Sequence, residues 1–338
     1  MKRSKNLPSS NDVAKLAGVS QSTVSLVLAG KAERRVSAEV QEKVREATRV
    51  LGYRPHAAAR TLRLGRAKAI ALLLPDVVNP YFAAVLRGAD RAARQQDYAL
   101  LFVDTENDQN WLEMVIGTLA AGSVDGFVLF GVEPPEQSEL GGFEPRIVVV
   151  DAPSSIFPLI AIDGMGGTLE AMNHLLSLGH RRIAYLGVSS SKETFRVRTR
   201  AYHQALNNAG INLGPDYEKS CLMDIDDAKV KAREILSLPD RPTAIFCADE
   251  RLAVGVYKVA KDMGLRIPID LSVVGFGGTQ IAHILEPELT TVNVPSESLG
   301  NLAVSSLIEC LETNVEPKSR IESVDFIIRG STTTLIQD

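Results

Sequence analysis

Residues 20–26 carry short polar side chains of the types that hydrogen-bond to base edges and phosphates. They are Ser20, Gln21, Ser22, Thr23 and Ser25, followed by Leu26. A glutamine carboxamide can pair bidentately with adenine, and a serine hydroxyl can donate or accept a hydrogen bond. Such side chains can read a nucleic acid only if a helix presents them at its surface. The elements around them therefore decide the chemistry.

The stretch Asn11–Leu28 predicts two short helices joined by a tight turn. Gly18 ends the first helix, where a left-handed backbone tolerates no Cβ, and Ser20 stands where an N-cap belongs. The apolar face of the first helix comprises Val13, Ala14, Leu16 and Ala17. Val24 and Val27 on the second helix would face it. This is the pattern of a helix-turn-helix, whose second helix enters the DNA major groove. A plain helical hairpin is the alternative.

A third helix is predicted from Ser37, its N-cap, to about Leu51, with Gly52 ending it. Three helices over about 45 residues make a headpiece with a thin core. Residues 1–66 hold 14 Lys and Arg against 5 Asp and Glu, a net charge of +9, whereas the remainder carries −13. A basic head on an acidic body indicates that the head binds a polyanion. A solvated basic tail is the alternative.

Pro55 can begin a further short helix, His56–Leu62. A helix of this length does not persist alone in water, because its nucleation is costly. From Lys68 the pattern changes to alternating strands and helices. Buried strands are predicted at AIALLLPD, Ala99–Asp104, Gly126–Phe130, Ile147–Asp151, Leu159–Asp163, Ile183–Gly187, Thr243–Ala248 and Ser272–Gly275. Alternating β and α elements predict doubly wound parallel sheets, here in two lobes with a cleft between them.

The sequence DVAKLAGVSQSTVSLVL resembles the start of the LacI/GalR (lactose-repressor) family, and GHRRIAYLG, GLRIPIDLSVVGF and PELTTVNVP are close to its later pattern. The resemblance implies an α/β protein with an all-α helix-turn-helix headpiece and a two-lobed effector domain of the periplasmic-binding-protein type I fold. The implied divisions are a headpiece at 1–54, a hinge helix and linker at 55–66, and an effector and dimerisation domain at 67–338. Lobe 1 would hold about 67–163 and 293–322, and lobe 2 about 164–292 and 323–338.

The resemblance also implies which residues contact DNA. Gln21, Ser22 and Leu26 would read bases, and Ser20, Thr23 and Ser25 would bind phosphate and set the register. Leu26 departs from the arginine that many members carry there, so the operator should differ at that base pair; core packing is the alternative for this side chain. Arg35 would reach a phosphate or a base edge. In the hinge helix, Leu62 would wedge open the central base step and Ala59 would give a close-packed surface. A plain linker is the alternative for that segment.

In the effector domain the resemblance places a small molecule between the lobes, at the carboxyl ends of the strands. The implied ligand residues are Asn79, Tyr81, Phe82, Asp151, Arg198, Asp249 and Phe276. Capping of the next helix is the alternative for the strand-end aspartates. Ala248 and Gly277-Gly278 stand where sugar-binding members commonly have ligand-bonding Asn and Asp. Each hydrogen bond that is missing should weaken the binding free energy of a polyol by about 1–1.5 kcal/mol. A ligand that is less hydroxylated, larger or more apolar than an ordinary hexose is therefore favoured, and a degenerate site is the alternative.

The sequence lacks the residues that other classes of function require. No phosphate-binding GxxxxGK[ST] loop, full dinucleotide fingerprint or nucleophile setting is present, so we expect neither an enzyme nor a cofactor. Cys221, Cys247 and Cys310 lack metal-ligand spacing, so no metal is expected either. No apolar run reaches the ~20 residues that span a bilayer, and no secretory signal is apparent. We therefore expect a cytoplasmic, nucleoid-associated protein with no membrane partner.

The expected activity is a ligand-responsive transcriptional regulator, most simply a repressor, acting on a near-palindromic double-stranded operator as a homodimer. The residues after Ile328 contain no apolar heptads, which favours a dimer over a tetramer. The alternative of another class is a solute-binding protein of a transport system, which shares a two-lobed body but requires export.

Overall fold

The computed structural model describes residues 8–28, 30, 32–33, 35–53, 66–105, 111–140 and 146–335. The chain divides into two compact units, Met1–Ala67 and Lys68–Asp338, which we call the headpiece and the body. The predicted hinge helix His56–Leu62, with Ala59 and Leu62, lies outside the described residues.

The headpiece contains three helices, α1 (Ser10–Ala17), α2 (Gln21–Leu28) and α3 (Ala38–Leu51). Ser9 begins α1 with a capping box to Asp12, and Gly18 ends it with a φ of 66°. Ser37 caps α3 through the Val40 amide. The headpiece core consists of Val13, Ala14, Val24, Val27, Ala32, Val44 and Ala47. The predicted caps and the inward-facing valines of α2 are thus confirmed.

Leu16 corrects the predicted apolar face of α1, because its side chain is 54% exposed. Val13 and Ala14 are buried on α1, and Ala17 packs beside them. At 100° per residue, Leu16 lies about 110° from the centre of that face, which places it outside the contact with α2 and α3.

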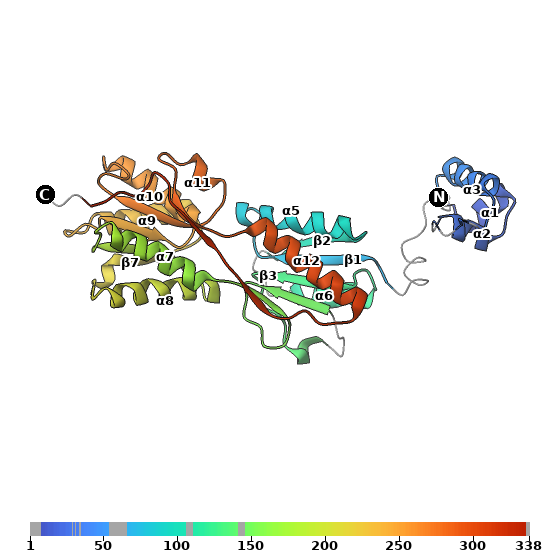
Figure 1. Cartoon of the computed structure of the whole chain (residues 1–338), viewed down its shortest axis with the longest axis horizontal. Helices are drawn as coiled ribbons and strands as arrows, with labels where there is room; N and C mark the ends of the chain where they lie inside the picture. Colours follow the sequence, from blue (N-terminus) through green and yellow to red (C-terminus); the bar gives the residue numbers. More distant parts are fainter. Residues whose placement is uncertain are drawn as a thin grey trace, which may run out of the picture. The chain divides into compact units, whose positions relative to one another are not determined.

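The body contains two six-stranded sheets (Figure 1). The first sheet has the order β11-β5-β4-β3-β1-β2 and is parallel throughout. Its strands are β1 (Ala69–Leu74), β2 (Ala99–Asp104), β3 (Gly126–Phe130), β4 (Arg146–Val150), β5 (Leu159–Ile162) and β11 (Arg320–Glu322). Every residue of β1 and β3 is buried, which explains their unbroken apolar sequences.

The second sheet has the order β12-β10-β9-β8-β6-β7. Its strands are β6 (Ile183–Val188), β7 (Glu218–Cys221), β8 (Ala244–Cys247), β9 (Ser272–Gly277), β10 (Thr290–Asn293) and β12 (Asp325–Ile327). The edge strand β12 runs antiparallel to β10, a departure from the predicted all-parallel sheet. We call the two halves built on these sheets lobe 1 and lobe 2.

Helices cover both sheets (Figure 1). They are α5 (Pro80–Gln95), α6 (Trp111–Ala120), α7 (Gly164–Ser177), α8 (Glu193–Asn208), α9 (Ile225–Leu236), α10 (Glu250–Asp262), α11 (Ile281–Ile284) and α12 (Ser296–Thr313), with short 3-10 turns at Gln137–Leu140 and Pro215–Tyr217. The sequence interpretation omitted α12, although Leu299, Ala303 and Leu307 repeat at helical spacing and are buried. It also omitted β7, β10, β11 and β12, which are strands of three or four residues.

The chain passes between the sheets after β5, after β10 and between β11 and β12. The carboxyl ends of the central strands of both lobes therefore face the same region. Within the described residues, no helix combines the length and apolar character that crossing a bilayer requires.

Candidate functional sites

The first residues of α2 form a polar surface on the headpiece. The Ser20 hydroxyl lies 3.2 Å from the Thr23 amide, which donates to it and so caps the helix. The same hydroxyl hydrogen-bonds to those of Ser22, at 2.7 Å, and Thr23, at 2.9 Å. Gln21 is exposed, and its amide nitrogen donates to the Ser10 hydroxyl at 2.7 Å. The carboxamide oxygen of Gln21 is not used in that bond and remains an acceptor for a base edge.

Leu26 and Arg35 complete the predicted set of headpiece contacts. Leu26 is partly exposed and is not among the described side chains that pack against the headpiece core. Arg35 is exposed in the loop before α3. Ser25 lies on α2 between the buried residues Val24 and Val27 and is itself partly exposed.

A cavity of about 480 Å³ lies between the two lobes of the body. All seven ligand residues predicted from the sequence line it, namely Asn79, Tyr81, Phe82, Asp151, Arg198, Asp249 and Phe276. Lobe 1 contributes the first four and lobe 2 the last three. The lining also includes Pro75, Asp76, Gly131, Val188, Ser189, Ser190, Ser191, Lys192, Thr194, Phe195, Met223, Glu250, Arg251, Gly277, Thr279, Ile281 and Val294.

Two of the predicted residues also have a local structural role. The Asn79 carboxamide oxygen accepts a hydrogen bond from the Tyr81 amide at 3.1 Å and caps α5. The Asp249 carboxylate accepts from the Arg251 amide at 2.8 Å and caps α10. The capping alternative therefore holds for Asp249. Each side chain nevertheless borders the cavity, because each cap stands at the carboxyl end of a central strand.

Arg198 is the principal buried cation of the cavity, with only 6% of its surface exposed. One terminal nitrogen donates to the Ala248 carbonyl at 2.6 Å and the other to the Thr194 hydroxyl at 3.2 Å. Its guanidinium carbon lies 3.7 Å from the ring centre of Phe276. Its Nε has no hydrogen-bond partner within the described residues. A buried donor without a partner is costly, so a bound molecule with an acceptor at that position would remove the penalty.

Asp151 faces Arg198 from lobe 1. Burial raises the pKa of Asp151 to about 6, against the opposing effects of Arg198, Thr194 and Lys192. Its backbone has a φ of 51°, a left-handed conformation that is uncommon for aspartate and occurs often at ligand sites. This carboxyl group can therefore act as an acceptor at neutral pH and as a donor at mildly acidic pH.

Aromatic rings form much of the lobe 1 wall. The ring of Tyr81 packs edge-on against Phe82 and Phe130, at centroid distances of 5.0 and 5.9 Å. The hydroxyl of Tyr81 is buried without a hydrogen-bond partner in the described chain. Burial raises the pKa of Tyr81 well above its ordinary value, so the group is a neutral donor. On lobe 2, Phe276 is buried and the Arg198 guanidinium covers one face of its ring.

Glu250 anchors the glycine-containing loop at the end of β9. Its carboxylate accepts from the Gly278 amide at 2.8 Å, the Thr291 hydroxyl at 2.8 Å, and the Thr279 amide and hydroxyl at 2.8 and 2.6 Å. A Cβ on Gly278 would lie 2.0 Å from the Asn293 side chain, and the φ of 76° there also requires glycine. The loop after β9 is thus anchored by a buried carboxylate whose two oxygens are both hydrogen-bonded.

Arg251 and Lys192 make polar contacts that join the lobes beside the cavity, and sequence reasoning missed both contacts. Arg251 of lobe 2 donates to the Asp76 carboxylate of lobe 1 at 3.2 Å. Lys192 of lobe 2 donates to the Gly131 carbonyl of lobe 1 at 3.1 Å. A signal was present for Asp76, since it comes two residues after the buried strand β1. The sequence offers no indication that Arg251, 175 residues later, would reach it.

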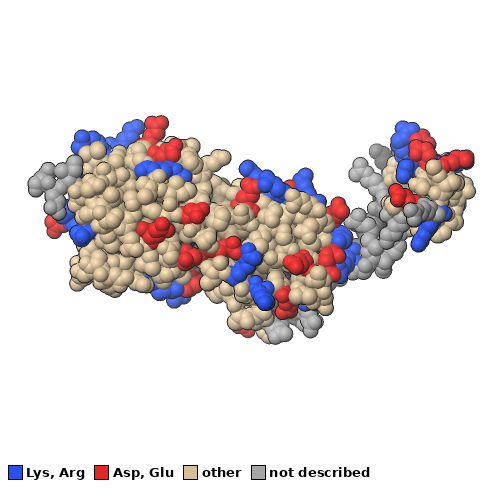
Figure 2. Space-filling model, viewed as in Figure 1, with Lys and Arg blue, Asp and Glu red and all other residues tan. Residues whose placement is uncertain are grey.

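The remaining charge in the body gives no second candidate site. On the face shown in Figure 2, blue and red side chains intermingle over the body, without a broad region of one sign. Within the described ranges, no group of three or more His, Cys, Asp or Glu side chains is placed to hold a metal ion.

The chain matches two protein-family models. Residues 11–56 match the bacterial regulatory proteins of the lacI family, and residues 172–332 match the periplasmic binding protein-like domain. The ribose operon repressor of Escherichia coli (strain K12) is 32% identical over 326 residues, which cover 95% of this chain and 98% of that protein. The HTH-type transcriptional repressor CytR of the same strain is 29% identical over 339 residues, 99% of each chain.

Solved structures give the same picture of the fold. The lac repressor dimer bound to operator and the anti-inducer ONPF matches with a TM-score of 0.85 at 23% identity, covering 96% of this chain and 99% of that one. The transcriptional regulator CelR in complex with cellobiose matches with a TM-score of 0.71 at 26% identity, with the same coverage.

Proposed function

The chain belongs to the lacI family of bacterial regulatory proteins, and we propose that it is a repressor whose ligand is held by Arg198, Asp151 and Tyr81 in the inter-lobe cavity. The resemblance predicted from the sequence is confirmed. The protein is a DNA-binding transcriptional regulator with a helix-turn-helix headpiece and a ligand-binding body. The alternative of a transport protein receives no support, because the relatives are repressors. Their names also support a role without catalysis.

The cavity supports control by a small molecule more strongly than any other observation. It is lined from both lobes, and among the described residues three buried polar atoms of its lining have no hydrogen-bond partner: the Arg198 Nε, the Arg251 Nε and the Tyr81 hydroxyl. A ligand that bonds to both lobes stabilises one lobe arrangement relative to others. A coupling of about 1–3 kcal/mol between ligand and DNA follows if DNA binding favours one of those arrangements.

The ligand we propose is less hydroxylated, larger or more apolar than an ordinary hexose. Ala248 is fully buried, and its carbonyl is occupied by Arg198. Gly277 borders the cavity without a side chain to offer, and the Glu250 carboxylate behind it is already bonded. The apolar and aromatic part of the lining comprises Tyr81, Phe82, Val188, Phe195, Met223, Phe276, Ile281 and Val294.

On the headpiece we propose that Gln21, Ser22 and Leu26 contact base edges. Phosphates would be contacted by Ser20, Thr23, Ser25 and Arg35. Gln21 and Ser22 lie exposed at the start of α2, where the first turn of a recognition helix meets the bases. Ala59 and Leu62 would act in the minor groove between two headpieces. The corresponding division is a headpiece at 1–54, a hinge at 55–66 and an effector domain at 67–338.

We further propose a homodimer on a near-palindromic operator, located on the nucleoid in the cytoplasm. β2 is an edge strand of the lobe 1 sheet, and its Leu101 and Phe102 are 47% and 53% exposed. An apolar edge strand of this kind is suited to contact with a second chain. Two-fold symmetry of the protein would then be mirrored in two half-sites. A stable tetramer in light scattering would contradict this assembly.

The test uses the full chain and a pool of random-sequence duplexes. Repeated selection should enrich a near-palindromic sequence, and binding to it should weaken steeply as salt rises. A thermal-shift screen of metabolites should then find a molecule that raises the melting temperature. Arg198→Lys should abolish that shift, because lysine cannot reproduce the bonds of the guanidinium to Ala248 and Thr194. Enrichment of no sequence would refute the proposal.

A further inference from the structure

The first residue of the body, Lys68, is held by side chains from three distant parts of the chain. Its backbone amide donates to the Asp125 carboxylate at 2.7 Å. Its ammonium donates to the Glu312 carboxylate at 2.6 Å and lies 4.3 Å from the ring centre of Tyr98. The Tyr98 hydroxyl donates to the same Glu312 oxygen at 2.7 Å. We call Lys68, Tyr98, Asp125 and Glu312 the Lys68 clamp.

The backbone of Lys68 is fixed in an unusual conformation. Its φ of 55° lies in the left-handed region, which a residue with a Cβ occupies only when its surroundings require it. The Lys68 carbonyl accepts from the Ala99 amide at 2.9 Å, so both peptide groups of the residue are bonded to the body. The direction in which the chain leaves the body toward residue 67 is therefore set by the body itself.

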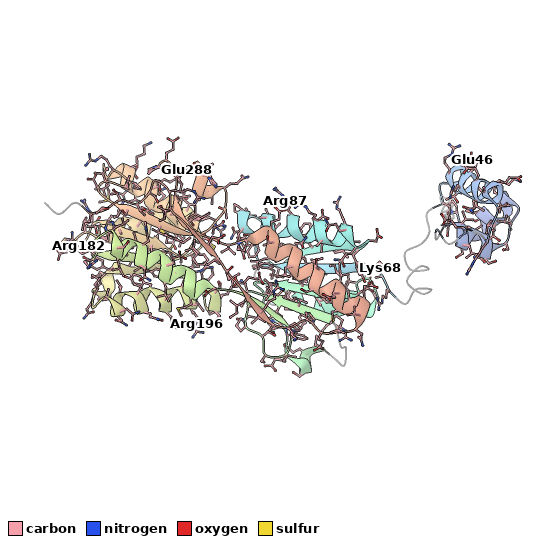
Figure 3. All side chains as sticks on the ribbon, in the orientation of Figure 1. Glu46, Lys68, Arg87, Arg182, Arg196 and Glu288 are labelled. Atoms are coloured by element: carbon pink, nitrogen blue, oxygen red, sulfur yellow. The ribbon has the colours of Figure 1, made fainter. Side chains whose placement is uncertain are left out.

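The partners of Lys68 stand at the far ends of two helices that begin at the ligand cavity. α5 carries Tyr81 and Phe82 of the cavity wall in its first turn, and Tyr98 follows three residues after its end. α12 begins two residues after Val294, which also lines the cavity, and carries Glu312 in its last turn. These helices are about 24 and 27 Å long. Lys68 lies at the start of β1, at the opposite end of lobe 1 from lobe 2 (Figure 3).

α5 and α12 are locked together where they cross (Figure 1). A Cβ on Gly88 would lie 1.8 Å from the Glu297 carbonyl oxygen, and one on Gly300 would lie 2.0 Å from the Val85 carbonyl oxygen. The two backbones are thus in direct contact. Arg91 of α5 also pairs with Glu297 of α12 at 2.6 Å. Helices packed this closely move together rather than slide past each other.

From these contacts, and resting on the proposed function, we infer that Lys68 is a positioning residue that couples the cavity to DNA binding. A change at the cavity moves the first turns of α5 and α12 together. Their far ends carry the displacement to Tyr98 and Glu312, which hold the residue at which the headpiece chain joins the body. Lys68 contacts neither ligand nor DNA in this role. Its ion pair is partly exposed, at 32% and 45%, so its removal should alter coupling more than stability.

The test measures coupling from the DNA side, because linkage between two sites is reciprocal. The probe is the duplex that the wild-type full chain selects from a random-sequence pool. Hydrogen exchange is followed at residues 79–86 and 294–301, with and without this duplex. The variants are Lys68→Met and the isosteric Glu312→Gln. The control is Lys231→Met, which breaks a pair of matched exposure, 31% and 42%, on α9.

In the wild type and in Lys231→Met, the duplex should change exchange at the cavity ends of both helices. In Lys68→Met and Glu312→Gln, the duplex should still bind but that change should be lost. Retention of the full change in a folded Lys68→Met or Glu312→Gln protein would overturn the inference. So would a wild type that binds the duplex without any change at the cavity. Failure to select a duplex would instead refute the proposed function, and the inference with it.

Discussion

The headpiece and the body differ in where the polar side chains of their candidate sites lie: at the surface in the headpiece and in an enclosed cavity in the body. On α2 of the headpiece, Ser20, Ser22 and Thr23 are hydrogen-bonded to one another at the surface, over a core of seven buried side chains among the described residues. In the body, Arg198 and Tyr81 have buried polar atoms without a hydrogen-bond partner among the described residues, inside a cavity between the two lobes. A surface suits a large, rigid partner such as a duplex. An enclosed cavity suits a small molecule that must displace water and contact both lobes.

The largest expected effect comes from separating the two regions. Deletion of residues 1–66 should abolish sequence-specific DNA binding, because the base-reading side chains and the region of net positive charge are removed. Gel-shift titration of the selected duplex over a range of salt concentrations measures the loss. Deletion should leave the ligand-dependent thermal shift of the body intact. Residual specific binding by the truncated chain would contradict the assignment of DNA binding to the headpiece and of ligand binding to the body.

The same core substitution should destabilise the headpiece by a larger fraction of its total stability than the body. Val24→Ala in the headpiece and Val304→Ala in the body each empty a fully buried site, at a cost of roughly 2 kcal/mol. A domain of this size has only about 3–5 kcal/mol to lose, so Val24→Ala should remove about half of the headpiece stability, lower its melting temperature strongly and weaken DNA binding near that temperature. Val304→Ala should lower the melting temperature of the body by only a few degrees. Calorimetry measures both transitions, and equal effects on DNA binding would contradict the comparison.

A substitution at the reading surface should change specificity rather than stability. Gln21→Ala should reduce discrimination at one base pair of each half-site by about 1–3 kcal/mol. Ser25→Ala is the matched control, since loss of a phosphate contact weakens binding to all sequences alike. Binding to single-base variants of the selected duplex distinguishes the two. If Gln21→Ala weakened binding to all duplexes equally, Gln21 would not contact a base edge.

The smallest expected effect is a pH dependence in the body. The pKa of Asp151 is raised to about 6 in the folded protein, above its value of 3.8 in an unfolded chain. The folded state therefore binds more protons between these values, and the resulting stability is present at low pH and lost as pH rises through 6. Asparagine is neutral at every pH, so Asp151→Asn should remove this pH dependence, and the melting temperature of the variant should rise relative to that of the wild type between pH 5 and pH 7. A difference that does not vary with pH would contradict the burial of this carboxyl group.

Local signals accounted for most of the elements and for the cavity wall. Gly18, Ser20 and Ser37 mark helix ends through chemistry that acts within four residues, so their positions were predictable. The seven ligand residues lie at the ends of buried strands or at the caps and in the first two turns of the helices that follow them, and parallel strands bring such positions to one edge. The short edge strands β7, β11 and β12 gave no comparable signal, because few of their residues are buried.

Contacts between residues far apart in the chain could not be predicted from the sequence. Asp76 and Arg251 are 175 residues apart, and Lys68 and Glu312 are 244 apart. Neither pair has a pattern that local periodicity would reveal, since a single exposed charge is compatible with many partners. Glu250 likewise reads as an ordinary residue in the first turn of α10. Only the fold brings it beneath Gly278 and Thr279.

The most direct test of the account is the effect of a cavity ligand on operator affinity in the full chain. A small molecule that raises the melting temperature is added to the protein with its selected duplex, and the dissociation constant is measured at fixed salt. The account predicts a change of about 5- to 150-fold for that duplex, which Arg198→Lys should eliminate. A molecule that stabilises the protein through the cavity yet leaves the dissociation constant unchanged would contradict it.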